Sequence, residues 1–124
     1  MNKFTEFLND SNTDLTLDEY QLLSSRTIGT DFTPIMMAGH ALHGMVSEIG
    51  ELHGLYQKAY QGHPMDDEHV MKEVGDVLWF LAEYCTGRGW HLGDIAMKNV
   101  NKLKARYPDG FEAEKSLNRK DGDV

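Results

Sequence analysis

Four acidic residues stand at regular spacing near the middle of the chain: Glu48 and Glu51 in the segment EIGE, and Glu73 and Asp76 in the segment EVGD. Acids three residues apart on an α-helix lie about 60° apart around its axis and about 4.5 Å apart along it. Carboxylates this close repel each other unless a cation lies between them, and Mg²⁺ prefers such oxygen ligands. The spacing therefore indicates two metal-binding pairs, although the solvent-exposed faces of two ordinary helices would show the same sequence pattern.

The segments around both pairs have the periodicity of amphipathic helices. Apolar residues recur every three or four positions over residues 42–59 and again over 70–85. On a helical wheel the first acid of each pair lies roughly 80–90° from the centre of its apolar stripe, and the second roughly 140–150°, in the same direction. The two pairs are thus able to face each other across a helix pair and still meet water. Gly44, beside the first pair on the wheel, either admits a ligand or allows a close helix crossing.

Capping and breaking residues divide the chain into four helices. Thr16 and Glu19 form a T-x-x-E capping box, and Thr33 followed by Pro34 is typical of an N-cap and a first helical residue. The segments GHP and PDG interrupt the helical pattern further on. We expect a first helix that runs from the capping box towards residue 29, and three more over about 34–60, 66–89 and 92–107.

No segment alternates as a strand would, and no internal repeat or interdomain linker is visible. The fold class is therefore predicted to be all-α and four-helix-bundle-like. We expect one domain over residues 1–124, with a core at about 16–111 and a polar C-terminal arm at 112–124. A chain of 124 residues buries a modest core by itself, so we expect a dimer or higher oligomer.

Composition narrows the setting of the site. The net charge of −8 argues against nucleic acid as a partner, because binding its backbone requires Lys and Arg. A smaller phosphate-bearing ligand stays open if cations bridge it to the acids. No apolar run reaches the ~20 residues that span a bilayer, so no membrane association is expected. The single Cys85 occupies an apolar helical position, which indicates a core residue and suits a soluble cytoplasmic protein.

The last predicted helix carries an amide and two cations on one flank. Asn99, Lys102 and Arg106 fall within roughly 60° of arc beside its apolar stripe. A lysine ammonium and an arginine fork together suit phosphate oxygens. The alternative is that basic residues near a helix C-terminus only complement its dipole.

The order EIGE, then EVGD, then NVNKLKARYPDGF resembles the MazG-like all-α nucleoside triphosphate pyrophosphohydrolases, from about Leu17 to Phe111. The resemblance implies a MazG-type oligomeric fold, a homodimer or homotetramer. It implies that four acids bind Mg²⁺, or Mn²⁺ as a substitute, and are also the catalytic residues; these are Glu48, Glu51, Glu73 and Asp76. It further implies that the triphosphate is contacted by Lys102, Arg106 and Asn99.

The chemistry that the resemblance implies is cleavage of a (deoxy)nucleoside triphosphate between its α and β phosphates. The products are a nucleoside monophosphate and pyrophosphate, which would serve house-cleaning of the nucleotide pool. Some relatives carry another acid directly before the first Glu, where this chain has Ser47. A general-base role for that extra acid therefore does not transfer, and the base stays open among the four carboxylates.

The residues that would bind the nucleobase are less well marked. The candidates for stacking on a base are Tyr20, Phe32, Trp79 and Phe80, and the candidates for hydrogen bonds to it are His40 and His43. Aromatic residues at helical spacing more often belong to the core. Since the chain has no HExxH segment, the two histidines indicate a polar helix face rather than a zinc site.

Three functions are compatible with these patterns. The first is a pyrophosphohydrolase of canonical or modified nucleoside triphosphates. The second keeps the chemistry but acts on phosphoribosyl-ATP or another specialised nucleotide such as ppGpp. The third is a non-catalytic helical interaction protein with acidic surface charge, and the co-occurrence of four acids with Lys102 and Arg106 argues against it.

Overall fold

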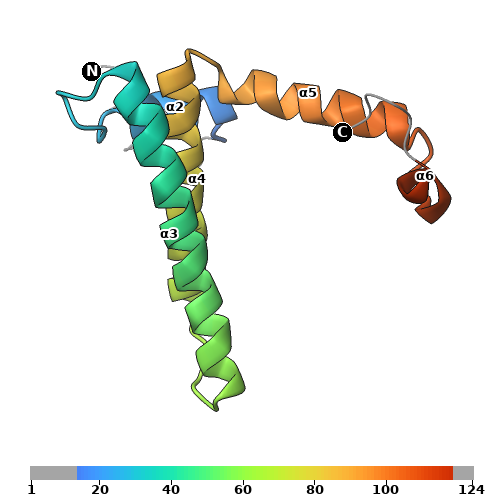
Figure 1. Cartoon of the computed structure of the whole chain (residues 1–124), viewed down its shortest axis with the longest axis horizontal. Coiled ribbons are helices and arrows are strands. Elements are labelled where there is room, and N and C mark those ends of the chain that lie inside the picture. Colours follow the sequence, from blue (N-terminus) through green and yellow to red (C-terminus); the bar gives the residue numbers. More distant parts are fainter. Residues whose placement is uncertain (1–13, 119–124) are drawn as a thin grey trace. The chain divides into compact units, whose positions relative to one another are not determined.

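The structure is a computed structural model, and it describes residues 14–118. These residues form five α-helices and no strand (Figure 1); the helices are α2 (Leu17–Ser25), α3 (Pro34–Tyr60), α4 (Asp67–Arg88), α5 (Leu92–Arg106) and α6 (Ala113–Leu117). The all-α fold expected from the sequence is confirmed. Within the described residues, no helix is both long and apolar enough to cross a membrane.

The chain divides into two compact units, and each is described by itself. The hairpin unit comprises residues 14–92 of the described chain and holds α2, α3 and α4. The C-terminal unit comprises residues 93–118 and holds the rest of α5 together with α6. A single domain over residues 1–124 stays a prediction. In the expected C-terminal arm, α6 is a short helix, and residues 119–124 lie outside the described part.

The predicted capping interactions are present. The Glu19 N–H donates to Thr16 Oγ1 at 3.1 Å, while the Thr16 N–H donates to Glu19 Oε1 at 3.0 Å. Thr33 Oγ1 accepts from the Met36 N–H at 3.2 Å, and the Asp66 side chain caps the start of α4. Each bond satisfies an N–H that the helix itself leaves free. The bounds of α3, α4 and α5 accordingly agree with the predicted ones to within one residue.

The helix α2 ends at Ser25, earlier than the sequence indicated. Residues 26–28 continue as turns in which each N–H donates to the carbonyl three residues back. Ser25 Oγ donates to the Leu22 carbonyl at 2.6 Å, and Thr27 Oγ1 donates to the Ser24 carbonyl at 2.8 Å. Serine and threonine hydroxyls that bond to nearby carbonyls compete with the α-helical pattern, which explains the early end.

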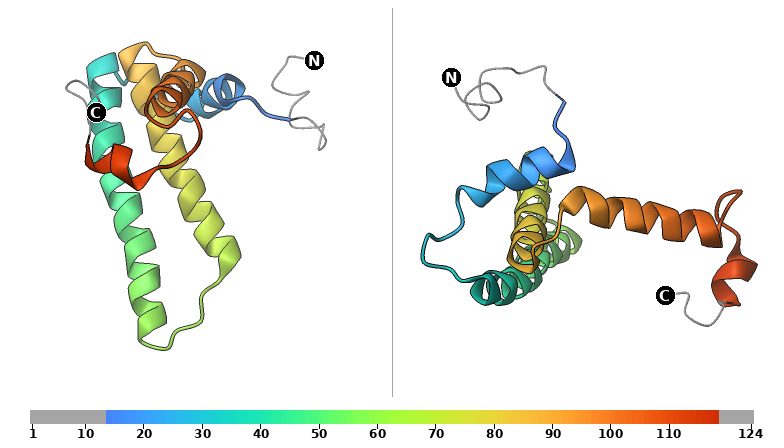
Figure 2. Two further views of the ribbon diagram at one scale, coloured as in Figure 1. Left: turned by 90° about the vertical axis from the view of Figure 1, so that its right-hand side faces the viewer. Right: turned by 90° about the horizontal axis from the view of Figure 1, so that it is seen from above.

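The helices α3 and α4 lie side by side as an antiparallel hairpin, joined by residues 61–66 (Figures 1 and 2). Small residues allow a close approach where α3 begins and α4 ends. A Cβ added at Gly87 would lie 2.8 Å from the Pro34 carbonyl oxygen and 3.0 Å from the Ala38 nitrogen. Ala41 and Ala82 are fully buried. The backbones of the two helices are therefore in close contact at this end of the hairpin.

Gln21 anchors α2 to the end of α4. Its side chain is only 8% exposed, and its Nε2 donates to the Trp90 carbonyl at 2.8 Å and to Thr86 Oγ1 at 3.2 Å. Its Oε1 accepts from the Leu92 N–H at 2.7 Å. This one side chain thus satisfies backbone groups about 70 residues further along the chain, a role that no local pattern in the sequence marks.

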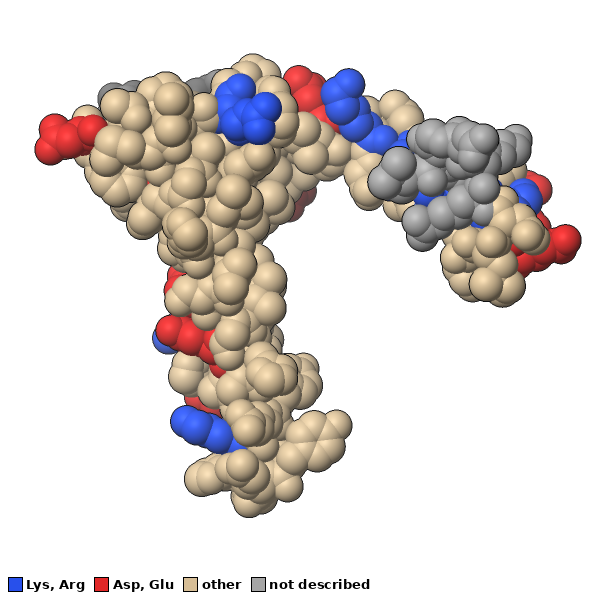
Figure 3. Space-filling model, viewed as in Figure 1, with Lys and Arg blue, Asp and Glu red and all other residues tan. Residues whose placement is uncertain are grey.

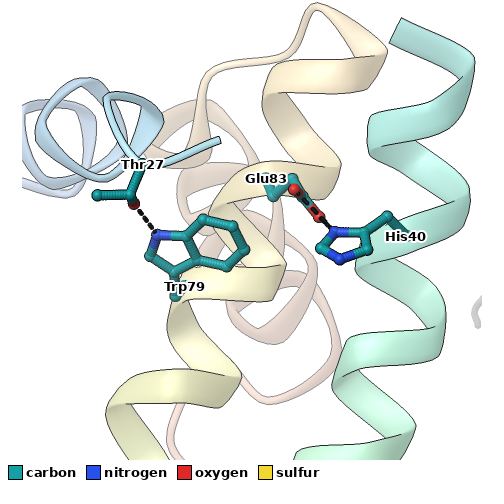
Figure 4. Close-up of polar contacts among 4 residues, drawn as sticks. All are labelled: Thr27, His40, Trp79 and Glu83. Atoms are coloured by element: carbon teal, nitrogen blue, oxygen red, sulfur yellow. Dashed lines mark hydrogen bonds and ion pairs between the residues drawn. The ribbon is translucent and has the colours of Figure 1, made fainter. Parts of the chain in front are cut away.

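Two polar side chains of α4 reach neighbouring segments of the hairpin unit (Figure 4). Glu83 is 1% exposed, and His40 Nδ1 lies 2.7 and 3.0 Å from its two carboxylate oxygens. Trp79 Nε1 donates to Thr27 Oγ1 at 2.8 Å. The histidine on α3 therefore provides the partner that a buried carboxylate requires.

The apolar stripes of the hairpin are only partly buried. Cys85 is 2% exposed, which confirms it as a core residue. Large apolar side chains along both helices are nevertheless more than a third exposed; they are Leu42, Val46, Ile49, Tyr56, Met71, Val74 and Leu81. In Figure 3, much of the face that α3 turns to the viewer carries no Lys, Arg, Asp or Glu. The stripes expected to be buried thus present a large apolar surface.

Candidate active site

The four carboxylates of the two pairs lie on the facing helices of the hairpin. The helix α3 carries Glu48 and Glu51, and α4 carries Glu73 and Asp76. Oxygen atoms of Glu48, Glu73 and Asp76 lie within 4.8 Å of one another. Glu51 stands outside this triad, but it lines a cleft together with Glu73. The structure therefore brings the two pairs together, with Glu51 beside the other three.

These carboxylates fit a hard divalent cation. Glu48 and Glu73 are half-buried, and Glu51 and Asp76 are exposed. When both groups are ionised, Glu48 Oε2 and Glu73 Oε2 are buried without a hydrogen-bond donor among the described residues. An unsatisfied buried oxygen is costly, and coordination to a cation would remove that cost. A donor set made only of carboxylate oxygens suits Mg²⁺ or Mn²⁺ better than a softer metal.

The proton affinities of the cluster reflect its uncompensated negative charge. A hydrogen bond with the Glu73 carboxyl, together with burial and the charges of the other three acids, raises the pKa of Glu48 to about 7. The pKa of Glu51 is also raised, mainly by a hydrogen bond with Glu73. The pKa of Glu73 is lowered, chiefly because it accepts a hydrogen bond from Glu48. Protonation and cation binding are therefore two ways to relieve the same repulsion.

A pH-dependent stability follows from the raised pKa of Glu48. The unfolded chain releases this proton near pH 4.5 and the folded chain near pH 7, so the contribution of Glu48 to the free energy of unfolding is largest below 4.5. That contribution falls as the pH rises through 7. We expect the melting temperature of wild type, relative to Glu48→Gln, to decrease between pH 5 and pH 8 in the absence of divalent cations. Parallel pH profiles of the two proteins would contradict the assigned repulsion, and added Mg²⁺ should reduce the decrease.

Two residues next to the carboxylates show how the site is packed. A Cβ added at Gly44 would overlap the Phe80 ring, so this glycine makes room for that ring where α3 and α4 cross. Burial and the charge of Asp76 raise the pKa of Tyr20, which places this residue of α2 near the acidic cluster. Of the two roles that the sequence left open for Gly44, helix crossing is therefore the one supported.

Four of the candidate nucleobase contacts form a continuous aromatic group. The ring centroids of Phe32 and His40 are 5.1 Å apart, those of His40 and Phe80 are 5.6 Å apart, and those of Phe80 and Trp79 are 5.1 Å apart, all edge to face. Phe80 follows Asp76 by one helical turn, so the group adjoins the acidic cluster. The exposed His43 takes no part in these ring contacts. A role of this group in base binding stays a prediction.

A cleft of about 270 Å³ opens beside Glu51 and Glu73. Lys58 of α3 and His69 of α4 also line it, and His69 Nε2 lies 3.2 Å from Glu73 Oε1. Neither residue is among the site residues predicted from the sequence. The spacing of four between His69 and Glu73 was a signal for their contact, whereas Lys58 carried none.

The predicted phosphate contacts belong to the C-terminal unit. Asn99, Lys102 and Arg106 lie on α5, where Asn99 and Lys102 are exposed and Arg106 is half-buried. The guanidinium carbon of Arg106 lies 5.8 Å from the centre of the Tyr107 ring. Lys102 and Arg106 are one helical turn apart and so present two cations on the same side of α5. Their approach to the carboxylates stays a prediction.

Comparison with known proteins points to one family. Residues 39–111, more than half of the chain, match the model of the MazG nucleotide pyrophosphohydrolase domain. The chain is also 25% identical over 103 residues to the Gene 37 protein of Mycobacterium phage L5, a match that covers 76% of this chain and 90% of the relative. No solved structure matches the chain. The family match spans both carboxylate pairs and all of α5.

Proposed function

This chain belongs to the MazG nucleotide pyrophosphohydrolase domain family, and from that premise we propose that it cleaves (deoxy)nucleoside triphosphates with Mg²⁺. Cleavage falls between the α and β phosphates and gives a nucleoside monophosphate and pyrophosphate, as in house-cleaning of the nucleotide pool. The observation that carries this proposal is the approach of Glu48, Glu73 and Asp76 to within 4.8 Å, with two buried oxygens that lack a hydrogen-bond donor in the described part of the chain.

The proposed reaction divides the work between the two pairs and α5. Glu48, Glu51, Glu73 and Asp76 would hold Mg²⁺, which when bound neutralises phosphate charge and favours deprotonation of water. One of the carboxylates accepts the proton of the attacking water. Lys102 and Arg106, with Asn99 beside them, bind the phosphate oxygens and orient the triphosphate for in-line attack by water. Mn²⁺, which also prefers carboxylate oxygens, would substitute for Mg²⁺.

A homodimer or homotetramer is part of the proposal. The exposed apolar residues of α3 and α4 support it, because monomeric proteins seldom present so much apolar surface. The net charge of −8 makes nucleic acid an unfavourable partner. A cytoplasmic location is also proposed, and the free thiol of Cys85 suits a reducing compartment.

The direct test is to incubate the purified protein with a panel of ribo- and deoxyribonucleoside triphosphates, with and without Mg²⁺, and to separate the products by chromatography. We expect monophosphate and pyrophosphate, formed only when the metal is present. Orthophosphate as the first product would refute cleavage between the α and β phosphates. Turnover confined to phosphoribosyl-ATP or ppGpp would instead identify the specialised relative, and no turnover of any nucleotide would favour a non-catalytic interaction protein.

Lys102 provides a test of the phosphate contacts. We expect Lys102→Ala to raise KM about tenfold, since a charged hydrogen bond to phosphate is lost, with the affinity for Mg²⁺ largely kept. Lys104 lies on the opposite side of α5 and is also exposed, so Lys104→Ala is the matched control and should leave KM unchanged. Steady-state kinetics and metal titration of both variants measure the difference. If Lys102→Ala changed neither KM nor kcat, the phosphate role would be wrong.

A further inference from the structure

The cleft beside the carboxylates continues along the hairpin towards its loop. Its α3 wall runs from Glu51 to Lys58, two helical turns or about 10 Å further on. Its α4 wall runs from Glu73 back to His69, one turn in the same direction because the helices are antiparallel. One end of the cleft is therefore formed by two proposed metal ligands, and the other end by a lysine and a histidine.

The lysine at the far end is available to a ligand. The Lys58 side chain is exposed, and its ammonium group forms no ion pair or hydrogen bond with any described residue, although Glu51 lines the same cleft. Gly54 lies between them on the same wall, where an added Cβ would meet no atom of the described residues within 4 Å. The wall is thus open between the carboxylates and the ammonium group. Such an arrangement suits an elongated anion that contacts a cation at the acids and Lys58 at its other end.

The size of the cleft selects the part of a substrate that it accepts. Its volume of about 270 Å³ is below the roughly 300–1,000 Å³ of pockets that enclose whole drug-sized molecules. A nucleoside triphosphate as a whole would not fit. Two linked phosphate groups are small, elongated and multiply charged, and in the proposed reaction they are the β and γ phosphates that leave together.

We propose that Lys58 binds the β and γ phosphates of the substrate in this cleft, which is then the subsite for pyrophosphate. The assignment rests on the proposed function for the identity of the anion. It adds to α3 a cation that acts on the leaving group, separate from Lys102 and Arg106 of α5. His69 lines the same cleft, and its Nε2 lies 3.2 Å from Glu73 Oε1.

The alternative role for Lys58 is structural. It stands in the last turn of α3, where a positive charge favourably complements the helix dipole. In that case Lys58→Ala would lower the melting temperature without altering the affinity for any anion. The two roles are therefore separated by a binding measurement on a folded variant.

The test is isothermal titration of inorganic pyrophosphate, in the presence of Mg²⁺, into wild type and three variants. We expect Lys58→Ala to weaken binding about tenfold and Lys58→Arg to retain most of it, since a cation is kept. Lys72→Ala removes an exposed lysine of α4 that does not line the cleft and should bind as wild type does. Circular dichroism confirms that each variant is folded. Equal affinity of wild type and Lys58→Ala, or no binding of pyrophosphate to wild type, would overturn the assignment.

Failure of this subsite is distinguishable from failure of the proposed function. If wild type releases pyrophosphate from nucleotides but Lys58→Ala binds it unchanged, the function stands and the subsite is refuted. If pyrophosphate binding depends on Lys58 while no nucleotide is turned over, the subsite stands as an anion site and the proposed function is refuted.

Discussion

Replacement of Glu73 by Gln is expected to abolish turnover and to leave the helical fold intact. Glu73 approaches the carboxyl groups of Glu48 and Asp76, and one of its oxygens is buried without a hydrogen-bond donor among residues 14–118. Glutamine keeps the shape of the side chain but removes the negative charge that a divalent cation requires. Loss of a metal that stabilises charge in the transition state lowers the rate by about 10³-fold or more.

The same substitution is expected to leave the melting temperature unchanged or slightly raised. One member of a group of like charges is neutralised, so repulsion within the cluster decreases. Asp76→Asn should behave in the same way. Glu68→Gln is the matched control, because Glu68 is an exposed acid in the first turn of α4, away from the cluster. Kinetics, circular dichroism and thermal melting of the three variants test this. Wild-type turnover by Glu73→Gln would refute its assignment as a metal ligand.

The second large effect is expected from Gly87→Ala, which acts on stability. The added Cβ would approach the Pro34 carbonyl oxygen to 2.8 Å and Met37 Cβ to 2.9 Å. The carbonyl is a backbone atom held within α3, so neither helix is able to yield locally and the hairpin must open slightly. Overpacking of this kind costs about 1–3 kcal/mol. We therefore expect the free energy of unfolding, measured by urea denaturation, to fall by about that amount.

Gly50→Ala, in the same hairpin, is expected not to lower the free energy of unfolding. A Cβ at Gly50 would meet no atom within 4 Å in the part of the chain that the structure describes, and alanine is favoured over glycine inside a helix by up to about 1 kcal/mol. This variant should be as stable as wild type or more stable. Equal effects of the two substitutions would show that helix propensity, rather than the close approach at Gly87, controls stability in this hairpin.

Local chemistry accounts for most of what the sequence predicted correctly. The starts of α2, α3 and α4 depend on capping groups within three residues of each helix, and such groups are recognisable from the amino-acid sequence alone. The carboxylates converge because each pair of acids lies at a similar angle from the apolar stripe of its own helix. Those angles follow from helical periodicity and are therefore also available from the sequence. The early end of α2 was missed because Ser25 and Thr27 bond to nearby carbonyls, a choice that composition does not reveal.

Contacts between distant segments that do not follow from helical periodicity were beyond prediction. Glu83 looked like any acid of an amphipathic helix, and its burial depends on a histidine 43 residues away. The position of Lys58 at a cleft was not predictable either, because residues of α4 form the other wall of that cleft. Half of the apolar stripe of α3 is exposed although its pattern predicts burial, because periodicity marks an apolar face without saying which surface covers it.

The contact of Gln21 with the Leu92 amide has a consequence for the dynamics of the hairpin unit. This backbone N–H has a side-chain acceptor from α2 in place of a helical carbonyl, so it exchanges with solvent only when α2 detaches. The same detachment frees the Trp90 carbonyl and Thr86. Opening of α2 and loosening of the segment after α4 are therefore one cooperative event, and the lifetime of the Leu92 amide proton reports how often it occurs.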